Sequence, residues 1–423
     1  MNNVLRRLSP ANLLALNRPP DQALTPAQMN ANIRHLVGDI AWFGIVWGSI
    51  VAFLQVYVVR LGASSFLVSA ITYGPALVAI FLQIPAGRLI QRTGHRMRWV
   101  IAAGLAYRAF FFAVALIPFF ILRGRAEATA LVWVLSAFGS SFSNIAFLAM
   151  MADAVSEEDR PRMISMRFAA FGLVNTITTL SAGLLLQLLS FPLNYQILFL
   201  IGSAGSMASW WHTRQIHVPD PMPEPAQGGP FWRSLGGVFR FPGYLRFVVA
   251  FFFLQLALGM VSPLLPLHWV RGLNASDTQV SLVLSTTTGA MVVGSLFMRR
   301  TVERIGRERA LAIGGAGYML YPLLTSFTTS MWWLIPWAVL AGLFTAAINV
   351  NLFDNLVSVT PPAGRMSHMA IYSTIQNVAL FLGPILASVL AEGAGGPVLG
   401  LRVAAGVGLL AGVLLALRRP ATA

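Results

Sequence analysis

Long apolar runs separated by short polar segments dominate the chain. A run of about 20 apolar residues is long enough to cross the hydrocarbon core of a membrane as a helix. The chain shows six such runs, then a polar, proline-rich stretch, then six more. They lie near residues 40–59, 65–86, 99–122, 129–151, 168–190, 193–211, 244–267, 276–298, 309–327, 331–353, 369–391 and 397–417. The pattern predicts an all-α polytopic membrane protein with 12 transmembrane helices.

The polar stretch divides the predicted helices into two six-helix bundles. Residues 36–212 are expected to form the first bundle and 241–418 the second, joined by a linker at 213–240. An even number of spans returns the chain to the side on which it began. The N-terminal segment 1–35, the linker and the tail 419–423 should therefore lie on one side of the membrane.

A helix start is predicted ahead of the first apolar run. Thr25 is a favourable N-cap, Pro26 suits the first helical position, and Gln28 completes the pattern of a capping box. The first helix should therefore begin well before the membrane-spanning part.

The composition supports a membrane protein and excludes several other classes. The chain is 57% hydrophobic and 10% charged, whereas a soluble domain carries about 25% charged residues. A net charge of +15 would suggest a nucleic-acid partner in a soluble protein, but here the arginines lie mainly in short loops between spans. The chain has no Cys, and its six His show no metal-ligand spacing. No nucleic acid, cofactor, metal or enzymatic activity is expected.

The arginines predict the orientation, because cytoplasmic loops carry an excess of positive charge. All but six of the 29 basic residues fall on the side of the termini and the linker. That side is predicted to be the cytoplasm, in a prokaryotic inner (plasma) membrane. The six exceptions are Arg60, Arg123, Arg125, Arg271 and Arg402, expected outside, and Arg108, which lies within a span.

An internal repeat supports the division into two bundles. The segment GRLIQRTG, Gly87 to Gly94, recurs as RRTVERIG, Arg299 to Gly306, and each follows the second span of its bundle. A second pair of similar segments follows the fourth spans, which end at Asp153 and Asp354. These two acids are candidate partners for the arginines. The matched positions in the first pair are Arg88 with Arg300, Gln91 with Glu303, Arg92 with Arg304, and Gly94 with Gly306.

With this repeat the chain resembles the major facilitator superfamily (MFS) of secondary transporters over about residues 32–418. The loop signature of that family reads roughly G-x-L-[AS]-D-[RK]-x-G-R-[RK], and this chain departs from it at Gln91, where Asp is usual, and at His95, where Arg or Lys is usual. The resemblance implies the MFS fold and a role for the loop as a cytoplasmic latch between the bundles. An arginine cluster that only sets orientation is the alternative. The matching residues are Gly87, Leu89, Arg92, Gly94 and Arg96.

The resemblance also implies a solute site near mid-membrane, lined by the first, fourth, seventh and tenth helices with the second, fifth, eighth and eleventh beside them. The polar side chains there are mainly neutral, so the expected solute is neutral or amphipathic. Each could instead join neighbouring helices by hydrogen bonds. The candidate residues are Gln55, Asn144, Asn175, Gln255, Asn349, Tyr372, Gln376 and Asn377.

Arg108 is the charged residue deepest in a predicted span. A buried arginine is costly and is usually paired. Long helical side chains point toward the N-terminus of their helix. The side chain of Arg108 should therefore extend toward the cytoplasmic side, where Asp39 lies in the first span. A structural Arg108–Asp39 pair is favoured over a role of Arg108 in anion binding or gating.

The sequence therefore predicts a secondary active or facilitative transporter that moves a small organic solute by alternating access. It is expected to be a monomer whose partners are the solute, membrane lipids and, if transport is coupled, a proton. No Asp or Glu lies in the middle of a span, which weakens proton symport. A diverged multidrug or metabolite exporter and a transporter-like ligand sensor remain the alternatives.

Overall fold

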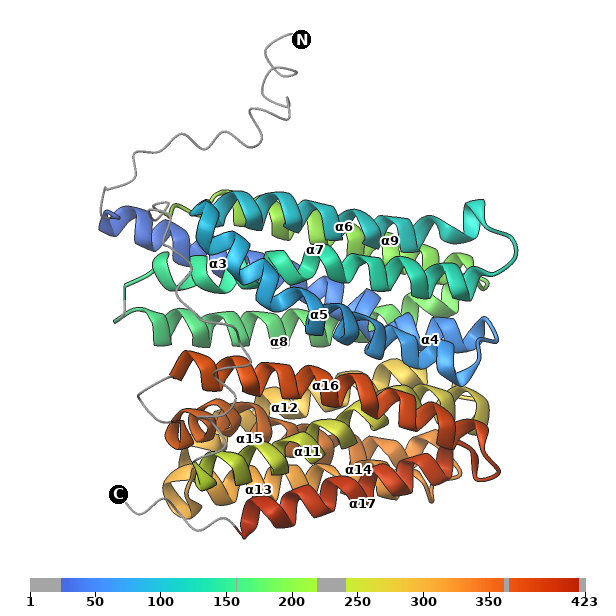
Figure 1. Cartoon of the computed structure of the whole chain (residues 1–423). Helices are drawn as coiled ribbons and strands as arrows, with labels where there is room; N and C mark the ends of the chain where they lie inside the picture. The colour runs from blue at the N-terminus through green and yellow to red at the C-terminus, as the bar shows by residue number, and fades with distance from the viewer. Residues whose placement is uncertain (1–23, 157, 219–240, 361–364, 418–423) are drawn as a thin grey trace.

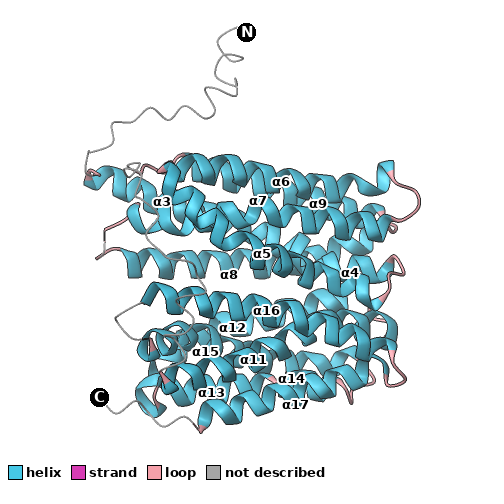
Figure 2. Ribbon diagram, in the orientation of Figure 1, coloured by secondary structure: helices cyan, strands magenta, loops and turns pink. Residues whose placement is uncertain are grey.

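The computed structural model describes residues 24–156, 158–218, 241–360 and 365–417. In these ranges the chain forms helices joined by loops, with no strand (Figures 1 and 2). The predicted segments 1–35 and 213–240 lie partly outside the described residues, and the tail 419–423 lies wholly outside them. The all-α prediction is confirmed.

The first half of the molecule comprises the helices from α3 to α9. The first span is one continuous rod in which a π-helical turn, η1, connects α3 to α4. The capping box of Thr25 and Gln28 is confirmed at the start of α3. The bounds are α3 Pro26–Val46, η1 Trp47–Val51, α4 Ala52–Arg60, α5 Ser65–Thr93, α6 Arg96–Phe120, α7 Arg125–Asp153, α8 Arg160–Leu188 and α9 Leu193–Arg214.

The second half comprises the helices from α11 to α17. Its ninth predicted span is broken at Met319, because Pro322 cannot donate to the carbonyl of Tyr318 and its ring clashes with it. The bounds are α11 Pro242–Leu267, η2 His268–Gly272, α12 Asp277–Ile305, α13 Arg307–Tyr318, α14 Leu320–Thr325, η3 Met331–Trp333, α15 Leu334–Val359, α16 Arg365–Glu392 and α17 Gly396–Ala416.

Ten of the 12 predicted spans are helices long and apolar enough to cross a membrane within the described residues. The sixth, α9, has sufficient length but contains several polar residues, among them Asn194, Gln196 and Ser203. The ninth is divided between α13 and α14, each of which is too short alone. Large apolar side chains such as Phe120, which is 81% exposed, cover the outside of the helices. Such a surface suits contact with lipid.

The two halves lie side by side as two layers of roughly parallel and antiparallel helices (Figure 1). The end of the molecule at which α3 begins and α17 ends is called here the terminal end, and the opposite end the far end. The halves pack against each other mainly through α5 on α16 and through α8 on α12. The first and seventh spans meet at the far end, where α4 contacts α11 and η2.

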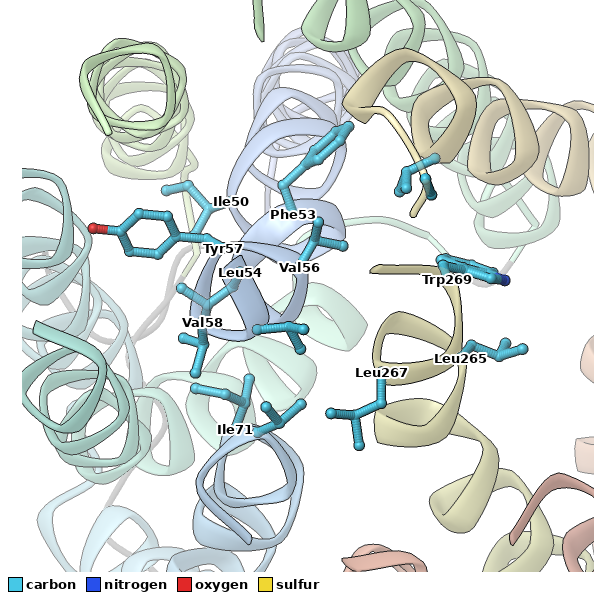
Figure 3. Packing of buried hydrophobic residues seen from close by; sticks show 14 of the residues in the cluster. Ile50, Phe53, Leu54, Val56, Tyr57, Val58, Ile71, Leu265, Leu267 and Trp269 are labelled. Carbon is cyan, nitrogen blue, oxygen red and sulfur yellow. The ribbon is translucent and has the colours of Figure 1, made fainter. Parts of the chain in front are cut away.

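Among the described residues, the buried apolar side chains form a core that the halves share at one end of the molecule. At the far end a single cluster joins residues of both halves, including Phe53 and Tyr57 of α4 with Leu267 and Trp269 of the seventh span (Figure 3). At the terminal end each half has a cluster of its own. The cluster of the first half contains Leu36, Met97 and Met150, and the cluster of the second half lies within the segment from α11 to α17. The halves are therefore fastened together at the far end.

Candidate functional site

A polar network at the far end joins the two halves. Arg60, the last residue of α4, donates from Nε to Oδ1 of Asp277 at the start of α12, at 2.7 Å. The hydroxyl of Tyr195 donates to the same carboxylate oxygen at 2.6 Å. The side chains of Arg60 and Asp277 are 25% and 13% exposed, so this ion pair is largely shielded from solvent. It fixes the first half to the second at the end of the first span.

Two arginines make reciprocal contacts across the far end. Arg60 of the first half donates from Nη2 to the carbonyl of Ala275 at 2.7 Å. Arg271 of the second half donates in return to the carbonyl of Ala63. Each arginine ends the first span of its half, and each acceptor lies in the loop that follows that span in the other half. The two contacts are thus related by the pseudo-symmetry of the halves.

These contacts lie in a third pair of repeated segments, which was not among the two pairs predicted from the sequence. The turn RLGASS at 60–65 matches RGLNASD at 271–277. Both turns contain a residue with positive φ, Gly62 at 82° and Asn274 at 50°, where Gly and Asn are the favoured residues. In both, a serine then caps the next helix. Comparing the loops after the first and seventh spans would have revealed this repeat.

The predicted candidate Gln55 lies at the interface between the halves, toward the far end. Its Nε2 donates to the Thr72 hydroxyl of α5 at 3.0 Å and lies 3.4 Å from the Ser262 hydroxyl of α11. Ser388 of α16 adds a second contact, because its hydroxyl lies 2.6 Å from that of Ser69. Gln55 therefore joins helices of both halves through its amide group.

The predicted candidate Asn377 lies in a second polar contact between the halves, nearer the middle of the spans. Oε1 of Gln83 on α5 accepts from Nδ2 of Asn377 at 3.2 Å and from the hydroxyl of Ser373 at 3.0 Å. Gln83 was not among the predicted residues. The helix α5 thus presents polar groups to the second half at two depths, through Thr72 and through Gln83.

Three further candidates gather on α11 and α16. The rings of Phe251 and Tyr372 stack with their centroids 4.4 Å apart, which brings the two helices together. Gln255 and Gln376 each lie four residues further along, one turn beyond these rings on the same helix face. Gln255 is buried, with 7% of its surface exposed. Tyr372, Gln376 and Gln255 therefore lie on α16 and α11, and α16 also carries the residues that contact Gln83.

The other three candidates are separate from this group. Asn144 of α7 is exposed. Asn175 of α8 accepts from the Thr179 hydroxyl within its own helix, at 3.4 Å. Asn349 of α15 lies 3.5 Å from Sδ of Met291. The structure thus links some of the predicted amides across the interface and leaves Asn144, Asn175 and Asn349 apart from them.

The predicted direct pair between Arg108 and Asp39 was wrong. The Arg108 guanidinium donates to backbone carbonyls of Ser206 and Gly104, at 2.9 and 3.1 Å, and to the hydroxyl of Ser209 at 3.0 Å. That hydroxyl donates in turn to Oδ1 of Asp39 at 2.7 Å. A serine bridges the two charged groups, and the hydrogen bonds of Arg108 connect α6 to α9.

The charged partner of Asp39 is Arg167. Its Nη1 lies 3.4 Å from Oδ2 of Asp39, and the two side chains are largely buried, 12% and 7% exposed. The prediction missed this pair because it began the fifth span near residue 168 and so placed Arg167 in a loop. The helix α8 begins at Arg160, which places Arg167 two turns inside it and beside α3. The whole buried network belongs to the first half.

The first copy of the loop signature forms a contact within the first half. Gly94 ends α5 with φ of 67°, the left-handed conformation expected for it. Arg96 then pairs with Asp153 at the end of α7. Arg88, Gln91 and Arg92 are exposed on the last turns of α5, and Gly87 is half-buried.

The second copy of the signature is built differently. Gly306 also has a positive φ, 81°, but its ψ of 153° differs from that of Gly94, which is −10°. Arg300, Glu303 and Arg304 are exposed on α12, and Asp354 is exposed on α15. Among the described side chains, no ion pair joins Asp354 to Arg300 or Arg304. The pairing of arginine with the acid of the fourth span therefore occurs in the first half alone, within the described residues.

The comparisons with known proteins agree with this architecture. The sequence profile of the Major Facilitator Superfamily matches residues 40–254 and 247–423. The tetracycline resistance protein, class H, of Pasteurella multocida is 25% identical over 139 residues, which are 32% of this chain and 34% of that protein. The uncharacterized MFS-type transporter YcaD of Salmonella typhi is 27% identical over 135 residues, 32% of this chain and 35% of that protein. The matched segments span about a third of each relative.

Solved structures match over nearly the whole fold. A mutant of the nucleoside transporter NupG superposes with a TM-score of 0.71 at 15% identity, covering 91% of this chain and 99% of that one. The D-xylose–proton symporter superposes with a TM-score of 0.69 at 12% identity, covering 94% of this chain and 98% of the other. At such identities the likeness shows the fold. With two halves related by repeated loops, apolar spans and a family profile that matches both halves, the chain belongs to the Major Facilitator Superfamily.

Proposed function

We propose that the protein is a secondary transporter that moves a small organic solute by alternating access. The observation that carries this proposal is the unequal joining of the two halves. They share one apolar core and the Arg60–Asp277 pair at the far end, whereas each has its own core at the terminal end. Rocking of one half against the other would open the far end and close the terminal end.

In this proposal the moving bodies are the predicted bundles at 36–212 and 241–418, and the terminal end faces the cytoplasm of a prokaryotic cell. The arginines support the orientation, because cytoplasmic loops carry an excess of positive charge. Arg60, Arg123, Arg125 and Arg271 lie at the far end, whereas the arginine-rich loop signatures lie at the terminal end. The structure then represents a state that is closed toward the outside. The protein is taken to work as a monomer surrounded by lipid.

The solute is proposed to bind where α5, α11 and α16 meet. The Gln83–Asn377 contact and the neighbouring Gln255, Tyr372 and Gln376 offer amide and aromatic groups with no net charge. Such a lining suits a neutral or amphipathic solute better than a multiply charged one. The Asp39 carboxylate already contacts an arginine and accepts hydrogen bonds from two hydroxyl groups. These contacts give no support to a role of Asp39 in proton coupling.

A diverged exporter is the second candidate, and the similarity to a tetracycline resistance protein over 139 residues favours it. Transport assays in proteoliposomes separate the two candidates by the class of solute that is moved, because movement of lipophilic cations would favour the exporter. The assay panel should contain sugars, nucleosides, amino acids, organic anions and lipophilic cations.

Asn377→Leu tests the location of the site. We expect transport of the identified solute to fall about 5- to 30-fold, since an amide that bonds a part-buried polar group contributes about 1–2 kcal/mol. The matched control is Asn144→Leu, the same change at an exposed position away from the interface. Equal loss in both variants, or none in either, would remove the proposed site.

A further inference from the structure

The far-end turns of the two halves match except at one charged position. Asp277, two residues after Ala275, neutralises Arg60 of the other half. The equivalent position two residues after Ala63 is Ser65. Arg271 therefore meets a neutral carbonyl where Arg60 meets both a carbonyl and a carboxylate. Among the described residues, Arg271 forms no ion pair.

A cavity of about 640 Å³ lies beside Arg271 at the far end of the second half. Its walls come from η2, from the loop between α14 and η3, and from the facing ends of α16 and α17. This volume is in the range of small-molecule sites, about 300–1,000 Å³. Three hydroxyl side chains line it beside the guanidinium: Ser326, Thr328 and Thr329.

His268 lines the same cavity and has an unsatisfied polar atom. It is 6% exposed, and its Nε2 has no hydrogen-bond partner. The imidazole of His268 thus forms part of the cavity wall, while its Nε2 is shielded from the open space.

A second guanidinium lies at the edge of the cavity. Nε of Arg402 lies 3.3 Å from the Ser326 hydroxyl, and its Cζ lies 4.5 Å from the centre of the Phe327 ring. The carboxylate nearest in sequence to the lining residues is Glu392, which follows Ala391 and is exposed. Within the described residues Glu392 pairs with neither arginine. Positive charge thus prevails around the cavity.

We propose that this cavity binds a small oxyanion, a carboxylate or phosphate group, that is held by Arg271. Guanidinium groups bind such oxyanions through two parallel hydrogen bonds. The hydroxyl of Thr329 adds a second donor, whereas those of Ser326 and Thr328 already donate to the carbonyls of Leu323 and Leu324. The bound group gives Arg271 the negative charge that Asp277 gives Arg60. This site is separate from the proposed solute site and does not depend on it.

Two kinds of molecule present such an oxyanion: a soluble anion, and an anionic lipid through the phosphate of its headgroup. Trp332 and Trp333 are 62% and 64% exposed at the same end of the second half. Exposed tryptophans of membrane proteins gather at the level of the headgroups. The cavity is therefore close to both the outer aqueous phase and the lipid phosphates, and the experiment must separate them.

Thermal unfolding of the purified protein in a neutral detergent tests the site. Sodium phosphate is titrated, with sodium chloride at equal ionic strength as the reference. We expect a saturable rise in unfolding temperature, because a ligand that binds the folded state stabilises it. Arg271→Gln should weaken the apparent affinity at least about tenfold, and Thr329→Val about fivefold. The Thr329 change touches neither the other half nor a charge, so it remains informative if Arg271→Gln fails to fold.

The control is Arg123→Gln, which removes the same charge from the far end of the first half, outside the cavity. A parallel series in phosphatidylcholine vesicles, with and without phosphatidylglycerol, tests the lipid source. Stabilisation by free phosphate that needs Arg271 identifies a soluble anion, and stabilisation by phosphatidylglycerol alone that needs Arg271 identifies a lipid headgroup. No stabilisation by either, or equal losses in Arg271→Gln and Arg123→Gln, overturns the proposal.

Discussion

The two ends of the molecule are held together in different ways. At the far end, charged and polar side chains reach from one half to the other, as Arg60 does to Asp277. At the terminal end, the ion pairs of the described residues lie within the first half, as Arg96 with Asp153 and Arg167 with Asp39. Contacts between halves control how the halves sit against each other, and contacts within a half stabilise that half.

This difference has a physical basis in the lipid environment. Lipid is as apolar as a leucine side chain, so spans associate through close packing and polar contacts rather than through the hydrophobic effect. The polar contacts therefore determine which pairs of helices can separate. The loss of a contact within a half should lower stability alone, whereas the loss of a contact between halves should change the balance of conformations.

The largest effect on stability is expected at Asp39. Asp39→Asn leaves the buried Arg167 without a counter-charge, and breaking a buried ion pair costs about 3–5 kcal/mol. The free energy of unfolding in mild detergent measures this loss. Because the pair lies within the first half, the accessibility of the far end should stay unchanged.

A double-mutant cycle distinguishes Arg167 from Arg108 as the partner of Asp39. Adding Arg167→Met to Asp39→Asn should restore part of the lost stability, since no unpaired charge remains. Adding Arg108→Met should give nearly additive losses, because Ser209 separates the two groups. Strong coupling of Asp39 to Arg108 alone would contradict the arrangement described here.

An intermediate effect is expected for the contact between the halves. Arg60→Gln should remove about 1–2 kcal/mol from the far-end-closed state, which raises the population of the open state by about 5- to 30-fold. Labelling of a single cysteine reports this change, because the native chain contains no Cys. A suitable position is Ser69, which is buried against Ser388 of the other half.

Ser69→Cys should therefore react faster with a membrane-impermeant thiol reagent when Arg60 is replaced. Asp277→Asn should have a similar effect, since it breaks the same pair. Arg123→Gln removes a charge from the same end with no contact between the halves, so it should leave the labelling rate unchanged. A rate that responds equally to Arg60→Gln and Arg123→Gln would mean that charge, and not the contact, holds the far end closed.

Several features of the fold could be predicted from the sequence because they depend on local patterns. The apolar runs gave the spans, and the glycine spacing gave the left-handed turn at Gly94. The break at Met319 was also encoded, by Pro322, but a hydropathy window averages over it. Averaging over a window also hides the polar residues of the sixth span and the division of the ninth into two short helices.

Contacts between distant segments could not be predicted in this way. The position of Arg167 depends on where α8 begins, and that start lies before the apolar run. The partners of Arg60 depend on which loop of the other half faces it. The repeat of RLGASS and RGLNASD was visible in the sequence, yet it indicates equivalent positions and not their reciprocal contact.

The smallest effect is expected at Arg96. Its pair with Asp153 is partly solvated, with side chains 26% and 38% exposed, and exposed pairs contribute about 0–1 kcal/mol. Arg96→Gln should therefore lower the free energy of unfolding by less than about 1 kcal/mol. Because the pair joins α6 to α7 within the first half, Ser69→Cys labelling should not change. If labelling did change, the loop signature would act across the halves at a distance, and the division between the two ends would fail.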